Sequence, residues 1–157
     1  METQSSPESV EKKVTLARAT LGDASQILEI EQSVGGLKTY SNLKTLEDAE
    51  KQVTESVTYL IKQGEEVVGN VSYVIKSPER VYIDGLVVMP QFSGQGLGKK
   101  AMKVMLEEIK DYKRIDLVTH PENAGAVKLY QSLGFEIESR VEDYFGDGEP
   151  RVVMVKK

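Results

Sequence analysis

The sequence predicts a single α/β domain with a mixed, mostly antiparallel central sheet of about seven strands, flanked by about four helices. Two observations support this prediction. Three strand-like runs between residues 57 and 88 are joined by turns short enough for antiparallel neighbours. A strand, a long amphipathic helix and another strand then follow, as in a crossover within one sheet. The expected order is therefore β-α-α-β-β-β-α-β-α-β-β.

The composition is that of an ordinary globular protein. Of the 157 residues, 39% are hydrophobic and 29% are charged, which suits a packed core and excludes a disordered chain. The absence of cysteine excludes disulfides, thiolate metal sites and a cysteine nucleophile, and a single histidine excludes a multi-histidine metal site. A net charge of −5 gives no electrostatic affinity for nucleic acid or anionic membranes. With no membrane span or signal peptide in the pattern, a cytoplasmic location is expected.

The N-terminal part of the chain predicts a tail, a strand and a helix. Residues 1–12 are polar and predict a disordered tail, so the domain is expected to cover 13–157. Val14–Ala19 alternates apolar and polar residues, as strands do. Asp23 is a favourable N-cap for a helix that Gly35-Gly36 ends, and the apolar positions of that helix are Ile27, Ile30 and Val34.

The following segment predicts a short helix and the three antiparallel strands. Thr45, with Asp48 three residues later, resembles a capping box that opens a helix reaching to Glu55. Alternation of apolar residues and the turn residues between the runs place the strands at Val57–Lys62, Val67–Lys76 and Arg80–Val88.

The C-terminal half alternates helices and strands. An apolar stripe at helical spacing predicts a helix over Gly98–Lys110. The remaining elements are a strand at Ile115–Thr119, a helix at Ala124–Leu133 closed by Gly134, and strands at Glu136–Glu142 and Arg151–Lys156.

A glycine-rich loop over residues 91–100 joins a strand to the long helix. Three glycines at alternate positions clear side chains from one surface, so that backbone N–H groups can converge beside the positive end of the helix. Such a place binds phosphate, although a tight flexible turn would use the same residues. The loop fits neither the dinucleotide fingerprint nor the nucleotide P-loop.

The stretch from Leu86 to Gly98 resembles the cofactor motif of the GNAT acetyltransferase superfamily, [Gln/Arg]-x-x-Gly-x-[Gly/Ala]. In the register that keeps the family's spacing from Pro90, Ser93 stands in the Gln/Arg position, which is a departure. A second register runs Gln91-x-x-Gly94-x-Gly96. The resemblance implies acetyl-CoA as cosubstrate, without a metal, and assigns its binding to Leu86, Val87, Val88, Ser93, Gly94, Gln95, Gly96, Leu97, Gly98 and Lys99.

A second family hallmark, Asn-x-x-Ala-x-x-Leu-Tyr-x-x-x-Gly-Phe, matches residues 123–135 at every specified position. The resemblance implies that Tyr130 gives a proton to the leaving sulfur and that Asn123 and Tyr130 contact CoA. It also implies that the strand of Leu86 and Val88 parts from the strand at 117–119, and that the pantetheine arm enters the gap between them. The alternative interpretation, a helix end capped by Gly134, would explain only the last residues of this motif.

The general base stays open among three residues. Related enzymes place it on the strand before the glycine loop, where Tyr82 and Asp84 share one face. Asp84 is chemically the better base if it is buried, and is otherwise a solvated charge. Histidine side chains ordinarily titrate in the useful range, and the single histidine, His120, stands at a strand end. Without a cysteine or an evident Ser-His pair, direct attack by the amine is expected, with no acetyl-enzyme.

The segment over residues 142–154 resembles the end of the protein N-terminal acetyltransferases of the ribosomal-protein-alanine type. There an aromatic pair, here Tyr144 and Phe145, lines the peptide entrance. Tyr40, between the first two helices, is a further substrate candidate. Val118 departs from that subgroup, which often has a catalytic Glu or His there. A protein or peptide α-amine is the favoured acceptor of the acetyl group.

Two other functions stay open. The acceptor could be a small amine such as a polyamine, an amino acid or an antibiotic, and Asp23, Glu29 and Glu31 would suit a polycation unless they form a solvated helix face. A non-catalytic acyl-CoA-binding regulatory module would fit the departures at Ser93 and Val118. The family resemblance is compatible with a monomer or a homodimer.

Overall fold

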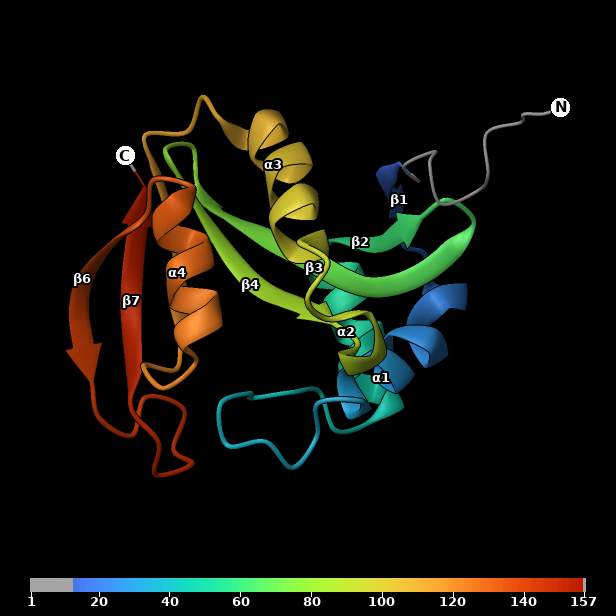
Figure 1. The fold of residues 1–157 in the computed structure, drawn as a ribbon, viewed down its shortest axis with the longest axis horizontal. Coiled ribbons are helices and arrows are strands. Elements are labelled where there is room, and N and C mark those ends of the chain that lie inside the picture. The colour runs from blue at the N-terminus through green and yellow to red at the C-terminus, as the bar shows by residue number, and fades with distance from the viewer. Residues whose placement is uncertain (1–12, 157) are drawn as a thin grey trace, which may run out of the picture.

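The computed structural model describes residues 13–156, so the predicted tail at 1–12 lies outside the described residues. One seven-stranded sheet, in the order β1-β2-β3-β4-β5-β7-β6, runs through the molecule (Figure 1). Every neighbouring pair in this sheet is antiparallel except β4 and β5, which are parallel. The predicted α/β fold, with a mostly antiparallel sheet and four α-helices, is therefore confirmed.

The elements begin and end within about two residues of their predicted positions, which is the precision expected of helix and strand boundaries. The strands are β1 (Val14–Arg18), β2 (Val57–Gln63), β3 (Glu66–Ser77), β4 (Arg80–Val88), β5 (Arg114–Thr119), β6 (Glu136–Val141) and β7 (Arg151–Lys156). The helices are α1 (Ala24–Gln32), α2 (Leu46–Glu55), α3 (Leu97–Ile109) and α4 (Ala124–Ser132).

Asp23 is the N-cap residue of α1, as predicted, but its side chain makes no capping hydrogen bond to that helix. Its carboxylate accepts a hydrogen bond from the backbone N–H of Thr20 (2.9 Å) and closes a short 3-10 turn, η2 (Leu21–Asp23). A carboxylate used in this way is not available to the first amides of α1, which have no side-chain cap. The capping box of α2 is confirmed, since the Thr45 hydroxyl accepts from the Asp48 amide and the Asp48 carboxylate accepts from the Thr45 amide.

Helices cover both faces of the sheet and bury two apolar clusters. The larger cluster lies under α3 and α4, and the smaller one lies under α1 and α2. Ile61 belongs to the larger and its neighbour Leu60 to the smaller, because successive side chains of a strand point to opposite faces. No helix in the described part of the chain is long and apolar enough to cross a membrane.

The end of β4 is held tightly against β3 at Gly69. A Cβ atom at this position would lie 2.0 Å from the carbonyl oxygen of Val87, so any side chain would push the two strands apart. The amide of Met89 donates to the carbonyl of Val68 (2.9 Å) just beyond the paired residues. This contact fixes where β4 ends and where the following loop starts.

A carboxylate on α3 ties that helix to the sheet. Glu108 accepts hydrogen bonds from the hydroxyl of Tyr59 on β2 (2.6 and 2.8 Å) and from the hydroxyl of Tyr73 on β3. Partial burial and the bond to Glu108 raise the pKa of Tyr59 from its ordinary 10.0 to about 12. The same causes raise the pKa of Tyr73.

Stability should therefore fall in alkaline solution. Between pH 10 and about 12 the unfolded chain loses a proton from Tyr59 that the folded chain keeps, so the free energy of unfolding falls as the pH rises. Urea unfolding from pH 8 to 11 measures this slope. In the double variant Tyr59→Phe/Tyr73→Phe the slope should be shallower, and an unchanged slope would contradict the role given to the two tyrosines.

Candidate functional site

The parallel strands β4 and β5 pair over only part of their length. Their register runs from Arg80 opposite Arg114 to Ile83 opposite Leu117 and stops there. Beyond this point β4 continues to Val88 beside β3, and β5 continues beside β7. A cavity of about 390 Å³ opens where the two strands part, and both strands line it. The predicted separation of these strands is thus present in the structure.

The glycine loop forms one wall of the cavity beside the N-terminus of α3. Gly94 (φ 81°) and Gly96 (φ 72°) have left-handed backbones, which glycine adopts without strain. A Cβ atom at either position would meet nothing within 4 Å, so the surface above the loop is open. Gly96 is the N-cap of α3 and offers no side chain, so the first amides of the helix, which have no intrahelical partner, also have no side-chain cap. An anion fits this arrangement.

Gly98 has a different function in the same loop. It lies inside α3, is buried, and a Cβ atom there would come within 3.3 Å of Leu129 on α4 and 3.7 Å of Leu86 and Val88 on β4. Its missing side chain allows α3 to pack closely on these elements. Before the glycines, a 3-10 turn that the sequence analysis missed, η3 (Pro90–Phe92), ends with the Ser93 hydroxyl donating to the Pro90 carbonyl (2.8 Å).

Most of the residues predicted to bind the cofactor line the cavity. Those that do are Leu86, Val87, Val88, Ser93, Gly94, Gly96, Leu97, Gly98, Asn123 and Tyr130. Gln95 and Lys99 do not line it, so the structure does not place them in contact with the space that the other residues enclose.

The second motif supplies two residues from α4. The Asn123 side-chain oxygen accepts from the amide of Ala126 (3.2 Å) and so caps the helix, while the residue also lines the cavity. Tyr130 is buried, and its ring packs edge-on against Phe135 at 5.9 Å between centroids. Burial raises the pKa of Tyr130 far above its ordinary value, and nearby Tyr40 adds to this effect. Its hydroxyl therefore keeps its proton at neutral pH, as a proton donor must.

Of the two candidate bases on β4, Asp84 is the better placed. Its carboxylate lines the cavity and accepts hydrogen bonds from the hydroxyls of Ser72 (2.6 Å) and Ser56 (2.9 Å). Tyr82 lines the same cavity, but burial raises its pKa, with a smaller contribution from the neighbouring Tyr144. A tyrosine that holds its proton so firmly is a poor base at neutral pH.

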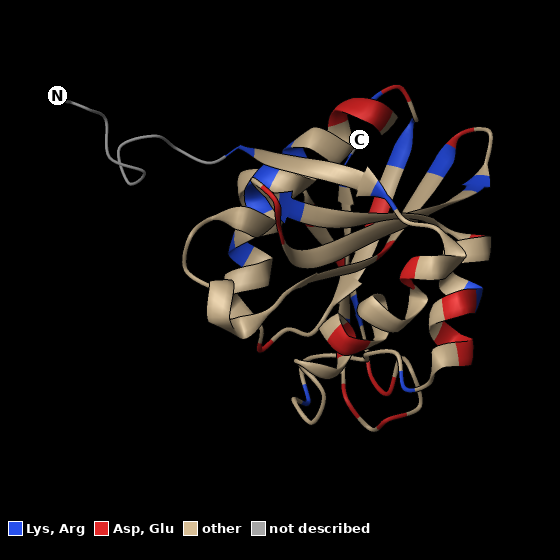
Figure 2. Ribbon diagram, turned by 90° about the vertical axis from the view of Figure 1, so that its right-hand side faces the viewer, with Lys and Arg blue, Asp and Glu red and all other residues tan. Residues whose placement is uncertain are grey.

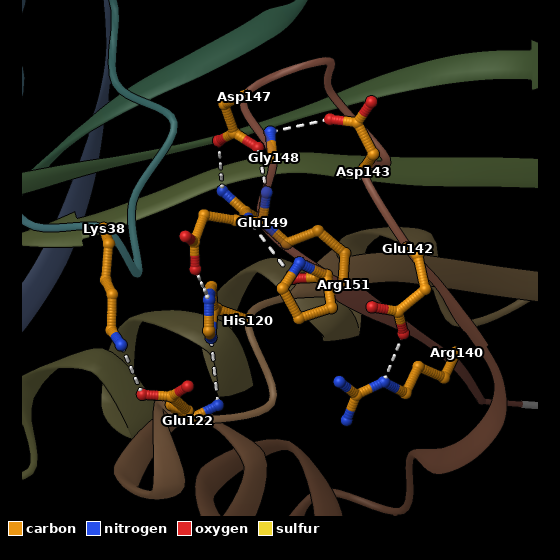
Figure 3. Close-up of polar contacts among 11 residues, drawn as sticks. Lys38, His120, Glu122, Arg140, Glu142, Asp143, Asp147, Gly148, Glu149 and Arg151 are labelled. Carbon is orange, nitrogen blue, oxygen red and sulfur yellow. Dashed lines mark hydrogen bonds and ion pairs between the residues drawn. The ribbon is translucent and has the colours of Figure 1, made fainter.

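His120 is fully buried and both of its ring nitrogens are engaged (Figure 3). Nδ1 accepts from the amide of Glu122 (3.0 Å), so the proton is on Nε2, which donates to Glu149 (2.7 Å). No lone pair is left to take a proton from a substrate. The histidine instead ties the end of β5 to the loop between β6 and β7, which sequence reasoning did not detect.

The loop between β6 and β7, residues 142–150, is held to its surroundings by polar contacts (Figure 3). Arg151 at its end is almost fully buried, pairs with Asp147 (3.1 Å) and lies 5.2 Å from the ring of Phe145. Phe145 and Arg151 line the cavity, whereas Tyr144, which is 39% exposed, packs on Phe145 and does not. Of the aromatic pair assigned to the entrance, Phe145 therefore faces the cavity and Tyr144, the residue named as the substrate contact, does not.

The loop between α1 and α2 completes the enclosure. Tyr40, a predicted substrate contact, lines the cavity together with Asn42 and Leu43. Lys38 of the same loop pairs with Glu122 (2.8 Å), and so links this loop to the loop between β5 and α4 on the exposed surface. Among the described residues, no group of three or more His, Cys, Asp or Glu side chains is placed to hold a metal ion.

Glu31 is a cavity residue that periodicity did not distinguish from its neighbours. On the sequence it belongs with Asp23 and Glu29 as an acidic residue of the first helix region. In the structure only Glu31 of these three lines the cavity, and it is 6% exposed. Its position at one end of α1, turned toward β3, could not be read from a helical pattern that assigns charged residues to the solvent face.

Comparison with known proteins agrees with this geometry. The sequence model of the acetyltransferase (GNAT) family matches residues 26–135, which is more than half of the chain. The chain belongs to the GNAT family of acetyltransferases. Its fold agrees with this assignment, because acetyltransferases of known structure share it.

The relatives of this GNAT protein differ in their acceptors. It is 33% identical over 81 residues to the spermine/spermidine N(1)-acetyltransferase of Bacillus subtilis, a match that covers 50% of each chain. The ribosomal-protein-S18-alanine N-acetyltransferase of Escherichia coli has a similar fold, with a TM-score of 0.75, 19% identity and coverage of 92% of this chain and 93% of that one. A GNAT acetyltransferase from Elizabethkingia anophelis, with acetyl-CoA bound, has a TM-score of 0.73, 20% identity and coverage of 92% and 97%.

Proposed function

We propose that this chain transfers an acetyl group from acetyl-CoA to a primary amine by direct attack of the amine. The observation that carries the proposal is the cavity between the parted ends of β4 and β5, with the open N-terminus of α3 at its wall. The same cavity is lined by Asp84, which can accept a proton, and by Tyr130, which can donate one. A module that only bound acyl-CoA would need neither group.

The residues that would hold acetyl-CoA fit it in two respects. The open surface above Gly94 and Gly96, together with the free amides at the start of α3, suits a pyrophosphate. The backbone of β4 from 84 to 88 has no strand partner on the side of β5 and can accept an extended chain through hydrogen bonds. Leu86 and Val88 are the residues of that segment expected to bind the pantetheine arm.

Asp84 and Tyr130 divide the proton transfers of the reaction. Asp84 takes a proton from the ammonium, directly or through water, so that the nitrogen has a free electron pair. The nitrogen then bonds to the thioester carbonyl carbon, and the carbon–sulfur bond breaks with its electron pair going to sulfur. Tyr130 donates its hydroxyl proton to that sulfur, and the nitrogen, which became positively charged on attack, gives up its second proton to restore the tyrosine. Asp84 releases the first proton to solvent, and the products are an amide and free CoA. Backbone amides near the end of β4 face the oxygen that becomes negative on the way.

For the acceptor we propose a small polycationic amine first and a peptide α-amine second. The observation in favour of a polycation is the presence of two carboxylates in the cavity, Glu31 and Asp84, neither of which has a Lys or Arg partner among the described residues. The observation in favour of a peptide, the acceptor that the sequence favoured, is the aromatic wall formed by Tyr40 and Phe145. The match to the curated relative spans only half of its length, so its acceptor does not decide the matter.

A panel of amines tests the proposed function. Purified protein with acetyl-CoA should release free CoA, detected with a thiol reagent, when a primary amine is added. Spermidine should be the fastest acceptor, followed by short peptides with a free N-terminus. If only peptides are acetylated, a peptide α-amine becomes the preferred acceptor in place of the polycation. If the protein binds CoA but no amine leads to the release of free CoA, the enzymatic function is contradicted.

Replacing Gly96 with a carboxylate should strongly weaken the binding of CoA. In Gly96→Glu the new carboxylate would lie at the start of α3 and repel phosphate, and affinity for CoA should fall by more than about tenfold in calorimetric titration. Gly64→Glu is a matched control, because Gly64 also has a positive φ (63°) and is exposed, but lies in the turn between β2 and β3 away from the cavity. Equal affinities of the two variants would refute the placement of the pyrophosphate.

Removing the hydroxyl of Tyr130 should slow turnover and leave binding unchanged. Tyr130→Phe keeps the ring that packs on Phe135, so the fold is retained and only the proton donor is lost. The kcat should fall by about 10²-fold, as is usual for the loss of a general acid, while the Kd for CoA stays within error. Steady-state rates and calorimetry measure the two quantities. A kcat equal to that of the parent would remove Tyr130 from the mechanism.

A further inference from the structure

The wall of the cavity nearest α1 contains a carboxylate with no cationic partner. Glu31 accepts hydrogen bonds from the amide of Leu43 (3.1 Å) and from the side-chain Nδ2 of Asn70 (3.3 Å). Asn70 is fully buried, and its side-chain oxygen has no hydrogen-bond partner. Hydrogen-bond acceptors therefore outnumber donors at this place, which is the arrangement that an ammonium group, with three donors and a positive charge, would complete.

Glu31 and Asp84 are held by neighbouring positions of one strand. Asn70, which bonds to Glu31, and Ser72, which bonds to Asp84, stand two residues apart on β3 and project from the same face. Residues with this spacing are about 7 Å apart along a strand. Burial raises the pKa of Glu31, and the charge of Asp84 adds to the effect, so each carboxylate lies within the field of the other.

The distribution of charge around the cavity agrees with a cationic ligand. Figure 2 shows Asp and Glu on the helices and loops at the lower edge of the view, with few Lys or Arg among them. The loop over 142–150 contributes four acidic residues and no basic one. The buried cation of the cavity, Arg151, is paired with Asp147 of that loop and so does not oppose a second cation.

We infer that Glu31 is the residue that selects acceptors with two cationic groups, by binding the ammonium that does not react while Asp84 serves the one that does. The inference rests on the proposed function for the role of Asp84. A ligand with two amines joined by a short alkyl chain would place one nitrogen at each carboxylate. An amine with a single charge would leave Glu31 buried and unpaired, which is unfavourable for binding.

The alternative is that Glu31 only anchors the loop between α1 and α2 through its bond to Leu43. The variant Glu31→Gln separates the two roles. Its side-chain oxygen can still accept from the Leu43 amide. Its NH2 group can donate to the unpartnered oxygen of Asn70 once the Asn70 amide turns over, because the Asn70 nitrogen now faces Glu31, so the fold is expected to be kept. Only the negative charge is removed.

The experiment compares putrescine with butylamine, two amines with the same carbon chain that differ by one ammonium group. Each is titrated calorimetrically into the full-length protein saturated with CoA, and each is then used as acceptor with acetyl-CoA. In Glu31→Gln the affinity for putrescine should fall by about tenfold and that for butylamine should change less than about twofold. Glu29→Gln is the matched control, because Glu29 lies on the same helix but is exposed and outside the cavity.

Each outcome decides one question. The inference is supported if Glu31→Gln loses affinity for putrescine, Glu29→Gln does not, and Glu31→Asp recovers part of the loss. This holds even if no amine is acetylated. In that case only the proposed reaction fails. If Glu31→Gln loses affinity for putrescine and butylamine equally, Glu31 only anchors the loop between α1 and α2. Unchanged affinities, or a parent protein that binds putrescine no better than butylamine, would overturn the inference while leaving acetyl transfer to other amines intact.

Discussion

The site depends on the separation of two strands that are neighbours in the sheet. β4 and β5 are each held by an outer neighbour beyond the point where they part, β4 by β3 and β5 by β7. At Gly69 the absence of a side chain allows β3 to follow β4 to its end, so β4 cannot swing back toward β5. The open backbone edge and the cavity follow from this constraint, since unpaired amides and carbonyls need partners that another molecule can supply.

The loop after β4 combines two uses of glycine that look alike in the sequence. Gly96 is needed for its left-handed backbone and its open surface, which expose the first amides of α3. Gly98 is needed for its small size, because α3 packs there against Leu129 and the end of β4. Gly96 thus creates a place for an anion, and Gly98 allows the helix to pack against the strand. Together they fix the position of the anion site relative to the parted strands.

The far side of the cavity is built by polar contacts rather than by apolar packing. His120 and Arg151 are both almost fully buried and both bind the β6–β7 loop, through Glu149 and Asp147 respectively. Buried polar groups require such partners, and the loop that provides them is thereby held against the cavity. This side of the cavity is thus anchored by buried polar contacts and presents Phe145 to the cavity.

The sequence by itself determined the order of elements and the capping box at Thr45, because helical and strand periodicity and caps act within a few residues. The two motifs at residues 86–98 and 123–135 were also legible in the sequence, through their resemblance to a family. The sequence could not separate Glu31 from Glu29 or find the anchoring role of His120. Those properties come from partners far away in the chain: Glu31 meets Asn70 across 39 residues, and His120 meets Glu149 across 29. Which acidic residue faces solvent and which faces a substrate is decided only when the sheet brings such segments together.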